Sequence, residues 1–254
     1  MRLLAVPAFS DNYIWTLVDD DGQAWIVDPG QAGPVFDAIG NALTPVGILL
    51  THHHDDHIGG VPALLERWPG LPVIAPHDAR ITTATQRVGE GVQVRVSGWT
   101  FDVLEIPGHT HSHIAFVGHG HLFCGDTLFG LGCGRLFEGT PMQMLTSLDK
   151  LAALPDDTRV CCGHEYTVAN AAFATTVDPD NAALRDRQQQ VIALRKAGQP
   201  TLPSTLGDER VGNPFLRVES PAVRAAIAHR LGREPADRVE TFAELRRWKD
   251  GFGA

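Results

Sequence analysis

Three histidines and one carboxylate lie within six residues of one another, in the order His52, His54, Asp56 and His57. They follow the apolar run 47–50, so two histidines fall on one side of an extended segment, and the Asp and the last His fall where the chain turns. Two first-row metals about 3.5–4 Å apart make a hydroxide near neutral pH and hold a carbonyl beside it. The loop therefore predicts most of a dinuclear hydrolytic site.

Three further candidate ligands, His109, Asp126 and His164, each follow a glycine at the end of a strand-like segment. Strand ends commonly gather chemistry at one rim, because a rigid strand aims the loop that follows it. Each of these residues taken singly is more often an ordinary polar residue, and only their joint placement favours a metal site. Together the candidates give each metal about three protein ligands if one Asp bridges, and this donor set suits zinc, iron or manganese.

The elements that must position these residues read as short strands and helices. We expect strands at 3–6, 13–18, 24–27, 47–50, 73–75, 92–96, 101–106, 114–117, 121–124 and 160–162. Helices are expected at 34–41, 62–68 and 142–154 and, beyond residue 165, at 181–197, 220–231 and 241–249. The sequence predicts an α/β fold of two packed sheets flanked by helices, followed by a small helical domain.

The distribution of charge supports this division and limits the partners. Residues 1–180 carry 8 basic and 21 acidic side chains, whereas residues 181–254 carry 13 and 9. An acidic chain argues against nucleic acid as the main partner, while a locally basic tail suits a small anionic substrate. No apolar stretch approaches the roughly 18–20 residues of a membrane span, and the four cysteines form no Cys-x-x-Cys pair. We expect a cytoplasmic monomer with no membrane partner.

Several motifs resemble those of a known family. The segment Thr51–Gly60 resembles the H-x-H-x-D-H metal motif of the metallo-β-lactamase superfamily. Six other segments together look like glyoxalase II, the hydroxyacylglutathione hydrolases: 7–13, 107–110, 125–129, 132–135, 162–166 and 213–215. The resemblance implies an αββα metallo-β-lactamase-like sandwich of two mixed sheets over residues 1–165. It also implies an α-helical substrate-binding domain over residues 166–254.

The same resemblance implies roles for individual residues. It places His52, His54 and His109 on one metal and Asp56, His57 and His164 on the other, with Asp126 bridging, and zinc is the most common metal for such a set. Asp56 and Asp126 would then also be catalytic, and the glutathione moiety would be bound by Arg135, Tyr166, Arg246 and Lys249. Phe137 stands where some members have tyrosine, and Asp55 adds a carboxylate where small or aromatic residues are usual.

The implied reaction is hydrolysis of the thioester of S-2-hydroxyacylglutathione. For S-D-lactoylglutathione the products are glutathione and D-lactate, in the second step of methylglyoxal detoxification. Two metals would lower the pKa of a bridging water from near 16 toward about 7, and the resulting hydroxide would attack the thioester carbonyl. A thiol has a pKa near 8.5, so glutathione thiolate leaves readily and needs no dedicated general acid.

Four rival functions compete with this one. A mononuclear iron persulfide dioxygenase shares the H-x-H-x-D-H loop but needs only two His and one Asp as ligands. A β-lactamase or an RNA-processing nuclease fits less well, because no Cys stands at the position of Asp126 and the chain is acidic. A structural zinc protein usually closes its site with four ligands, often thiolates, and no Cys falls at a candidate ligand position here.

Overall fold

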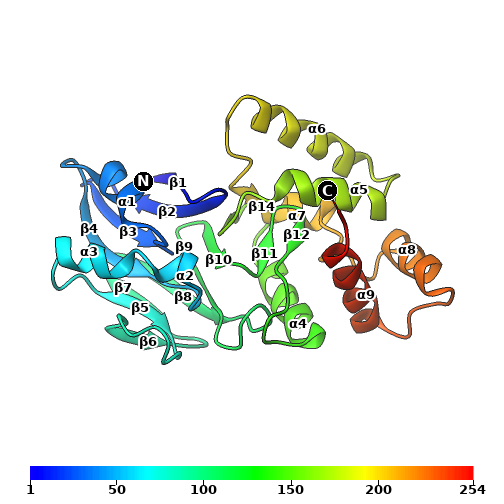
Figure 1. The fold of residues 1–254 in the computed structure, drawn as a ribbon, viewed down its shortest axis with the longest axis horizontal. Coiled ribbons are helices and arrows are strands. Elements are labelled where there is room, and N and C mark those ends of the chain that lie inside the picture. The colour runs from blue at the N-terminus through cyan, green and yellow to red at the C-terminus, as the bar shows by residue number, and fades with distance from the viewer. Residues whose placement is uncertain (254) are drawn as a thin grey trace. The chain divides into compact units, whose positions relative to one another are not determined.

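The computed structural model describes residues 1–253, and the chain forms two compact units (Figure 1). Unit 1 comprises Met1–Glu105, Ser112–Gly125 and Cys161–His164. Unit 2 comprises Ile106–His111, Asp126–Val160 and the chain from Glu165 onward. Among the described residues, no helix combines the length and the apolar character that a membrane span requires.

The first sheet of unit 1 follows the chain order. Its strands are β1 (Arg2–Ala8), β2 (Asn12–Val18), β3 (Gln23–Val27), β4 (Thr44–Leu49), β5 (Val73–Pro76) and β6 (Gln86–Val88). The pairs from β1 to β3 are antiparallel, and those from β3 to β6 are parallel. The sheet is therefore mixed. The sequence predicted all of these strands except β6, whose only apolar residue is Val88.

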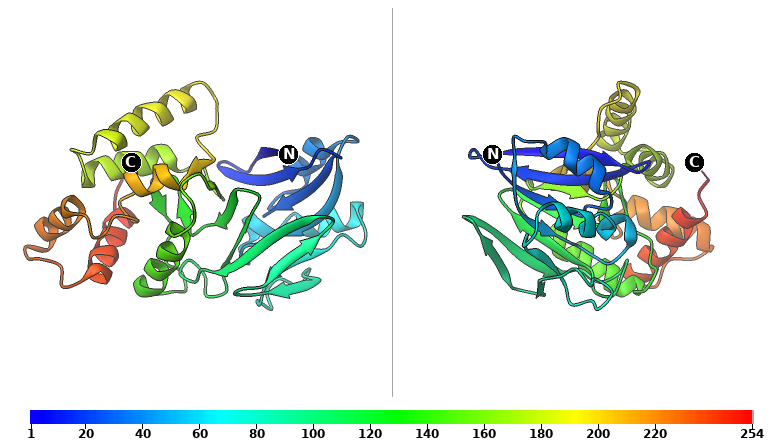
Figure 2. Two further views of the ribbon diagram at one scale, coloured as in Figure 1. Left: turned by 180° about the vertical axis from the view of Figure 1, so that it is seen from behind. Right: turned by 60° about the vertical axis from the view of Figure 1, so that its left-hand side comes forward.

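Helices cover one face of this sheet. They are α1 (Ala32–Ile39), α2 (Asp55–Ile58) and α3 (Val61–Arg67), and they can be followed in Figure 2. Val35 and Ile39 of α1 and Leu64 of α3 belong to one buried cluster with Ile26 and Ile48 of the sheet. Apolar residues at helical spacing thus fix α1 and α3 against the strands. The loop between β4 and α2 carries His52 and His54.

The second sheet of unit 1 packs against the first. It contains β7 (Gln93–Val96), β8 (Trp99–Glu105), β9 (Ile114–Gly118) and β10 (His121–Gly125), joined by antiparallel pairing. The ring of Trp25 on β3 meets Phe101 on β8 edge-on, with 5.7 Å between centroids. A Cβ atom at Gly47 would lie only 2.2 Å from the Trp25 ring, so glycine at this position lets the indole fill the space between the sheets.

Unit 2 contains the remaining helices. Its helices are α4 (Pro141–Ala152), α5 (Thr167–Val177), α6 (Ala182–Lys196), α7 (Leu206–Gly212), α8 (Pro221–Leu231) and α9 (Arg238–Asp250). A short hairpin joins β11 (Leu128–Phe129) to β12 (Gly132–Cys133), and β14 (Ser204–Thr205) pairs with the first residues of β13 (Arg159–Cys162). The sequence predicted β13, α4, α6, α8 and α9 but missed α5, α7 and the two-residue strands β11, β12 and β14.

Candidate active site

Asp56, His57 and His164 meet in unit 1. Asp56 and His57 lie on α2, and His164 follows β13. Asp56 Oδ2 lies 3.5 Å from His57 Nε2 and 3.3 Å from His164 Nε2. Ligands bound to one tetrahedral metal at 2.0–2.1 Å lie about 3.4 Å from each other. The donor types and their spacing therefore fit one divalent ion.

Two carboxylates hold the far side of these imidazoles. Asp28 lies 3.0 Å from His57 Nδ1, and Asp11 lies 2.8 Å from His164 Nδ1. A carboxylate acceptor at Nδ1 favours the tautomer that keeps the proton there and leaves the Nε2 lone pair for a metal. Asp28 also accepts hydrogen bonds from the Thr51 backbone N–H at 2.8 Å and hydroxyl at 2.7 Å. Sequence reasoning assigned a role to neither aspartate, although Asp28 directly follows a predicted apolar strand and Asp11 lies in the family-like segment 7–13.

His52 and His54 are neighbours in the same unit. His52 Nε2 and His54 Nδ1 lie 3.1 Å apart, close to the spacing that one metal requires, and His52 Nδ1 lies 3.0 Å from the Thr51 hydroxyl. His52 also stacks on His113, whose role sequence reasoning left unassigned, with 4.5 Å between centroids. His53 contacts Asp78 instead, at 3.5 Å, in accord with the alternation of an extended segment.

His109 and Asp126 belong to unit 2. His109 Nε2 lies 3.5 Å from Asp126 Oδ2, and His109 Nδ1 lies 2.9 Å from the Arg135 carbonyl oxygen, which again turns Nε2 toward the carboxylate. The ring of Phe137 packs edge-on against His109 at 5.1 Å, and its side chain is otherwise exposed. The seven candidate ligands thus divide between the units, five in unit 1 and these two in unit 2.

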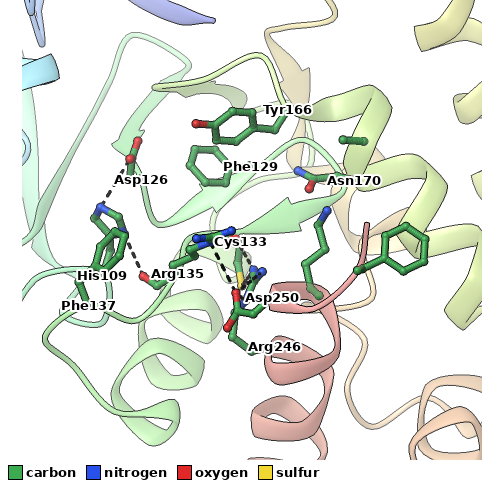
Figure 3. Close-up of a pocket in the computed structure, with 13 residues that line it drawn as sticks. His109, Asp126, Phe129, Cys133, Arg135, Phe137, Tyr166, Asn170, Arg246 and Asp250 are labelled. Carbon is green, nitrogen blue, oxygen red and sulfur yellow. Dashed lines mark hydrogen bonds and ion pairs between the residues drawn. The ribbon is translucent and has the colours of Figure 1, made fainter. Parts of the chain in front are cut away.

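A cavity of about 500 Å³ opens beside His109 and Asp126, and every residue that lines it belongs to unit 2 (Figure 3). All four residues predicted to bind substrate line it: Arg135, Tyr166, Arg246 and Lys249. Figure 3 shows Tyr166 beside Phe129 on the wall that adjoins Asp126, and the two rings meet at 5.3 Å. Cations, aromatic rings and two candidate metal ligands therefore share one pocket.

The cations in this pocket are held at short range from one another. Arg246 is buried and donates to the Cys133 carbonyl oxygen at 2.7 Å and to Asp250 at 3.0 Å. Arg135 lies 3.7 Å from the same Asp250 carboxylate. Burial, aided by the nearby Arg246 and Arg135, lowers the pKa of Lys249. A cluster of cations that destabilise each other's charge in a partly dry pocket favours binding of an anion.

Cys133 lines the same pocket but is not a reactive thiol. Its side chain is buried, and burial raises its pKa to about 11, against which the nearby Arg246 has only a partial effect. A nucleophilic cysteine requires the thiolate, which a raised pKa disfavours near neutral pH. Cys133 therefore offers no nucleophilic thiolate to this pocket near neutral pH.

Two family models together match nearly the whole chain. Residues 14–164 match the metallo-beta-lactamase superfamily, and residues 165–252 match the hydroxyacylglutathione hydrolase C-terminus. A hydroxyacylglutathione hydrolase of Xylella fastidiosa (strain M23) is 61% identical over 252 residues, covering 99% of this chain and 98% of the relative. One from Xanthomonas campestris pv. campestris (strain B100) is 58% identical over the full length of both chains.

Solved structures share the fold at lower identity. BLEG-1 B3 metallo-beta-lactamase is 26% identical with a TM-score of 0.63, covering 85% of this chain and 98% of that one. ETHE1 from Myxococcus xanthus is 25% identical with a TM-score of 0.66, covering 100% of this chain and 91% of that one. The predicted α/β class, with mixed sheets, flanking helices and a helical C-terminal region, is confirmed.

Proposed function

The chain belongs to the hydroxyacylglutathione hydrolase family of the metallo-β-lactamase superfamily, and we propose from this how its own residues hydrolyse a glutathione thioester. The substrate is an S-2-hydroxyacylglutathione, and the products are glutathione and a 2-hydroxy acid. With S-D-lactoylglutathione the acid is D-lactate, which completes methylglyoxal detoxification. The observation that carries the proposal is that His109 and Asp126 line the same pocket as Arg135, Arg246 and Lys249.

The seven candidate ligands are proposed to hold two divalent metal ions, with zinc first and iron or manganese as alternatives. His52, His54 and His109 hold one ion, Asp56, His57 and His164 hold the other, and Asp126 is shared between them. Donor spacings of 3.1–3.5 Å within each unit support this assignment. When bound by these residues, such ions would supply a hydroxide at neutral pH and would polarise the thioester carbonyl.

The chain's own residues orient the reactants. Asp56 and Asp126 are the proposed catalytic residues, and their carboxylates direct the attacking oxygen toward the thioester carbon. Asn12 donates to Asp56 Oδ2 at 3.0 Å, and this is the same oxygen that lies nearest His57 and His164, so the hydrogen bond helps to hold the carboxylate in place. Glutathione leaves as a thiolate, and its thiol pKa near 8.5 removes the need for a general acid.

Substrate binding is proposed to rest on Arg135, Tyr166, Arg246 and Lys249. The three cations receive the carboxylates of glutathione, whose net charge is negative, and charge-assisted hydrogen bonds of this kind are stronger than neutral ones. The Tyr166 ring contacts Phe129 in the pocket, and its hydroxyl group is proposed to bind the peptide part of the substrate. Phe137 offers only its ring at the position where some relatives have a phenol.

We further propose a catalytic domain over residues 1–165, a substrate-binding helical domain over 166–254, a monomeric state and a cytoplasmic location. The two family models meet between residues 164 and 165, which supports the boundary. Four buried cysteine thiols fit a reducing compartment. Sedimentation at several protein concentrations tests the oligomeric state, and a second copy in the sedimenting species would contradict it.

The test of the function is turnover of S-D-lactoylglutathione by purified protein, with metal quantified on the same sample. The proposal expects chelator-sensitive hydrolysis at two metal ions per chain and its loss in Asp126→Ala. Full turnover by Asp126→Ala with both metals retained would refute the assigned role. Oxygen consumption with glutathione persulfide, at one iron per chain and without thioester hydrolysis, would instead establish the dioxygenase.

A further inference from the structure

We propose that Glu209 and Asn213 are positioning residues for the substrate pocket, because they fix the β11–β12 hairpin that joins Asp126 to Arg135. The proposal rests on the function proposed above and goes beyond it, since neither residue lines the pocket. It also gives a role to the segment Asn213–Phe215, which the sequence comparison singled out and the catalytic assignment leaves unused.

The hairpin turn is held by polar side chains that the protein buries completely. Glu209 and Asn213 have no exposed surface. The backbone N–H of Leu131 donates to Glu209 Oε2 at 2.7 Å, and Asn213 Nδ2 donates to the carbonyl oxygens of Gly132 at 2.9 Å and Phe129 at 3.2 Å. The helical part of unit 2 thus bonds to both strands of the hairpin and to its tip.

The two clamping residues are bonded to each other as well. Asn213 Nδ2 also donates to Glu209 Oε2 at 3.0 Å, and the Asn213 backbone N–H donates to the Glu209 carbonyl oxygen at 2.8 Å. Asn213 Oδ1 accepts from the Phe215 backbone N–H at 3.0 Å, which sets the orientation of the amide group. The amide cannot flip without breaking contacts on both of its ends, so the donor stays aimed at the hairpin.

The conformation of the hairpin requires such support. Leu131 adopts a left-handed backbone conformation, with φ of 55°, that a leucine side chain disfavours. Its side chain is buried in a cluster with Ala171, Ala174, Leu184 and Val191. The tip is therefore anchored by apolar packing on one side and by the Glu209 carboxylate on the other.

Displacement of this hairpin would reach the chemistry directly. Phe129 and Cys133, one on each strand, line the pocket, Asp126 precedes the hairpin and Arg135 follows it. Gly134 donates from its backbone to Thr127 at 3.1 Å, and a Cβ atom at Gly134 would lie 1.9 Å from the Asp126 carbonyl oxygen. Because a misplacement of about 1 Å can cost on the order of 100-fold in rate, a loosened hairpin should lower turnover without any change in the reacting groups.

The proposal predicts which substitutions are tolerated. Glu209 is the acceptor in its hydrogen bonds with Leu131 and Asn213, and burial raises its pKa, so the neutral amide of Glu209→Gln retains the acceptor at little electrostatic cost. Glu209→Leu removes the acceptor. Asn213→Asp replaces a donor by an oxygen that faces two carbonyl oxygens and the Glu209 carboxylate. Asn181→Ala is the matched control, because it removes a helix cap and a bond to the Val211 carbonyl in the same unit but touches no hairpin residue.

The experiment measures kcat, KM, thermal midpoint and amide hydrogen exchange over residues 126–135 for these variants. We expect Glu209→Leu and Asn213→Asp to lose about 10-fold or more in kcat/KM at a temperature where they are folded, with faster exchange in this segment. Glu209→Gln should stay within about two-fold of the wild type, whereas Asn181→Ala should lower the midpoint and leave kcat/KM unchanged.

The outcomes separate this proposal from the proposed function. Wild-type protein that fails to hydrolyse the thioester contradicts the function, while the exchange readout still tests the hairpin. If Glu209→Leu and Asn213→Asp behave like Asn181→Ala, with lower stability but native kcat/KM and native exchange in the segment, the residues are merely structural and the proposal is overturned. If Glu209→Leu does not fold, Asn213→Asp and Glu209→Gln decide the question by the same readouts.

Discussion

Replacement of Asp28 by Asn is the sharpest test of the metal centre, because it changes one atom outside the donor set. The buried Asp28 carboxylate gives Oδ1 to the Thr51 backbone N–H and shares Oδ2 between the Thr51 hydroxyl and His57 Nδ1. If the new amide keeps its oxygen on the Thr51 N–H, its NH₂ group faces His57 Nδ1. That nitrogen must then accept a hydrogen bond, which moves the imidazole proton to Nε2 and removes the lone pair that would bind a metal.

The expected magnitude follows from this change of tautomer. Loss of such an outer partner typically weakens metal affinity about 10–100-fold, or roughly 1.4–2.8 kcal/mol. We expect Asp28→Asn to weaken the binding of one of the two metal ions within that range and to leave the binding of the other near its wild-type affinity. Asp11→Asn makes a matched comparison at His164. Since Asp11 is more exposed than Asp28, water can replace its oxygen, and we expect the lower end of the range.

The assay is a metal titration against a competing chelator of known affinity, with stoichiometry measured per chain and near-ultraviolet circular dichroism as a check on tertiary structure. Two sites of wild-type affinity in a folded Asp28→Asn protein would refute the assignment of His57 Nε2 as a ligand atom. Equal weakening of both sites with altered circular dichroism would show that Asp28 acts on the fold of the loop instead.

Three further predictions concern the pocket and the metals. Chelation should abolish hydrolysis but leave the far-ultraviolet circular dichroism largely intact, because unit 1 has a buried hydrophobic cluster that includes none of the candidate metal ligands. Unfolding on chelation would contradict this. The pKa of Lys249 is lowered, so the ammonium charge is present below that pKa and is lost as the pH rises through it. KM should therefore rise in the alkaline range below pH 10.5. Lys249→Arg should abolish this rise in KM, because the guanidinium stays charged there. Asp250→Asn removes a partly exposed anion 3.0 Å from Arg246 and should lower KM about 2–5-fold, whereas a higher KM would show that Asp250 orients the arginine.

The sequence predicted well those features that lie in short stretches of chain. The strands from β1 to β5 and from β7 to β10 repeat an apolar pattern over a few residues, and the donors His52, His54, Asp56 and His57 lie on one loop. The grouping of Asp56 with His164 came from the family resemblance, and the structure shows their side chains 3.3 Å apart. Short strands such as β6 and β14 could not be predicted, because two or three residues are too few to show a periodic apolar pattern.

Features that arise from contacts between distant segments were beyond sequence reasoning. Asp28 and Glu209 look like ordinary acidic residues in the sequence, and Asp11 lies in a family-like segment that assigns it no role. Only the structure brings these three to His57, Leu131 and His164. Helix α5 was missed for a related reason. It is rich in Ala with β-branched residues at both ends. Its buried residues lie on one face, but the opposite face also carries apolar residues such as Val168 and Ala172, so the sequence shows no contrast between an apolar and a polar face.

The hairpin explains why residues 126–160 form one compact unit with the helices that follow residue 165. Burial of a leucine such as Leu131 contributes roughly 1.5–3 kcal/mol, which attaches the hairpin firmly but leaves its direction open, because apolar packing is not directional. Hydrogen bonds from Asn213 and Asn170 to the turn carbonyls, and from Leu131 to Glu209, supply that direction. A carboxylate that must lie within a few tenths of an ångström of its working position, as Asp126 is proposed to, needs both contributions. In this chain the helices that would bind the substrate also supply them.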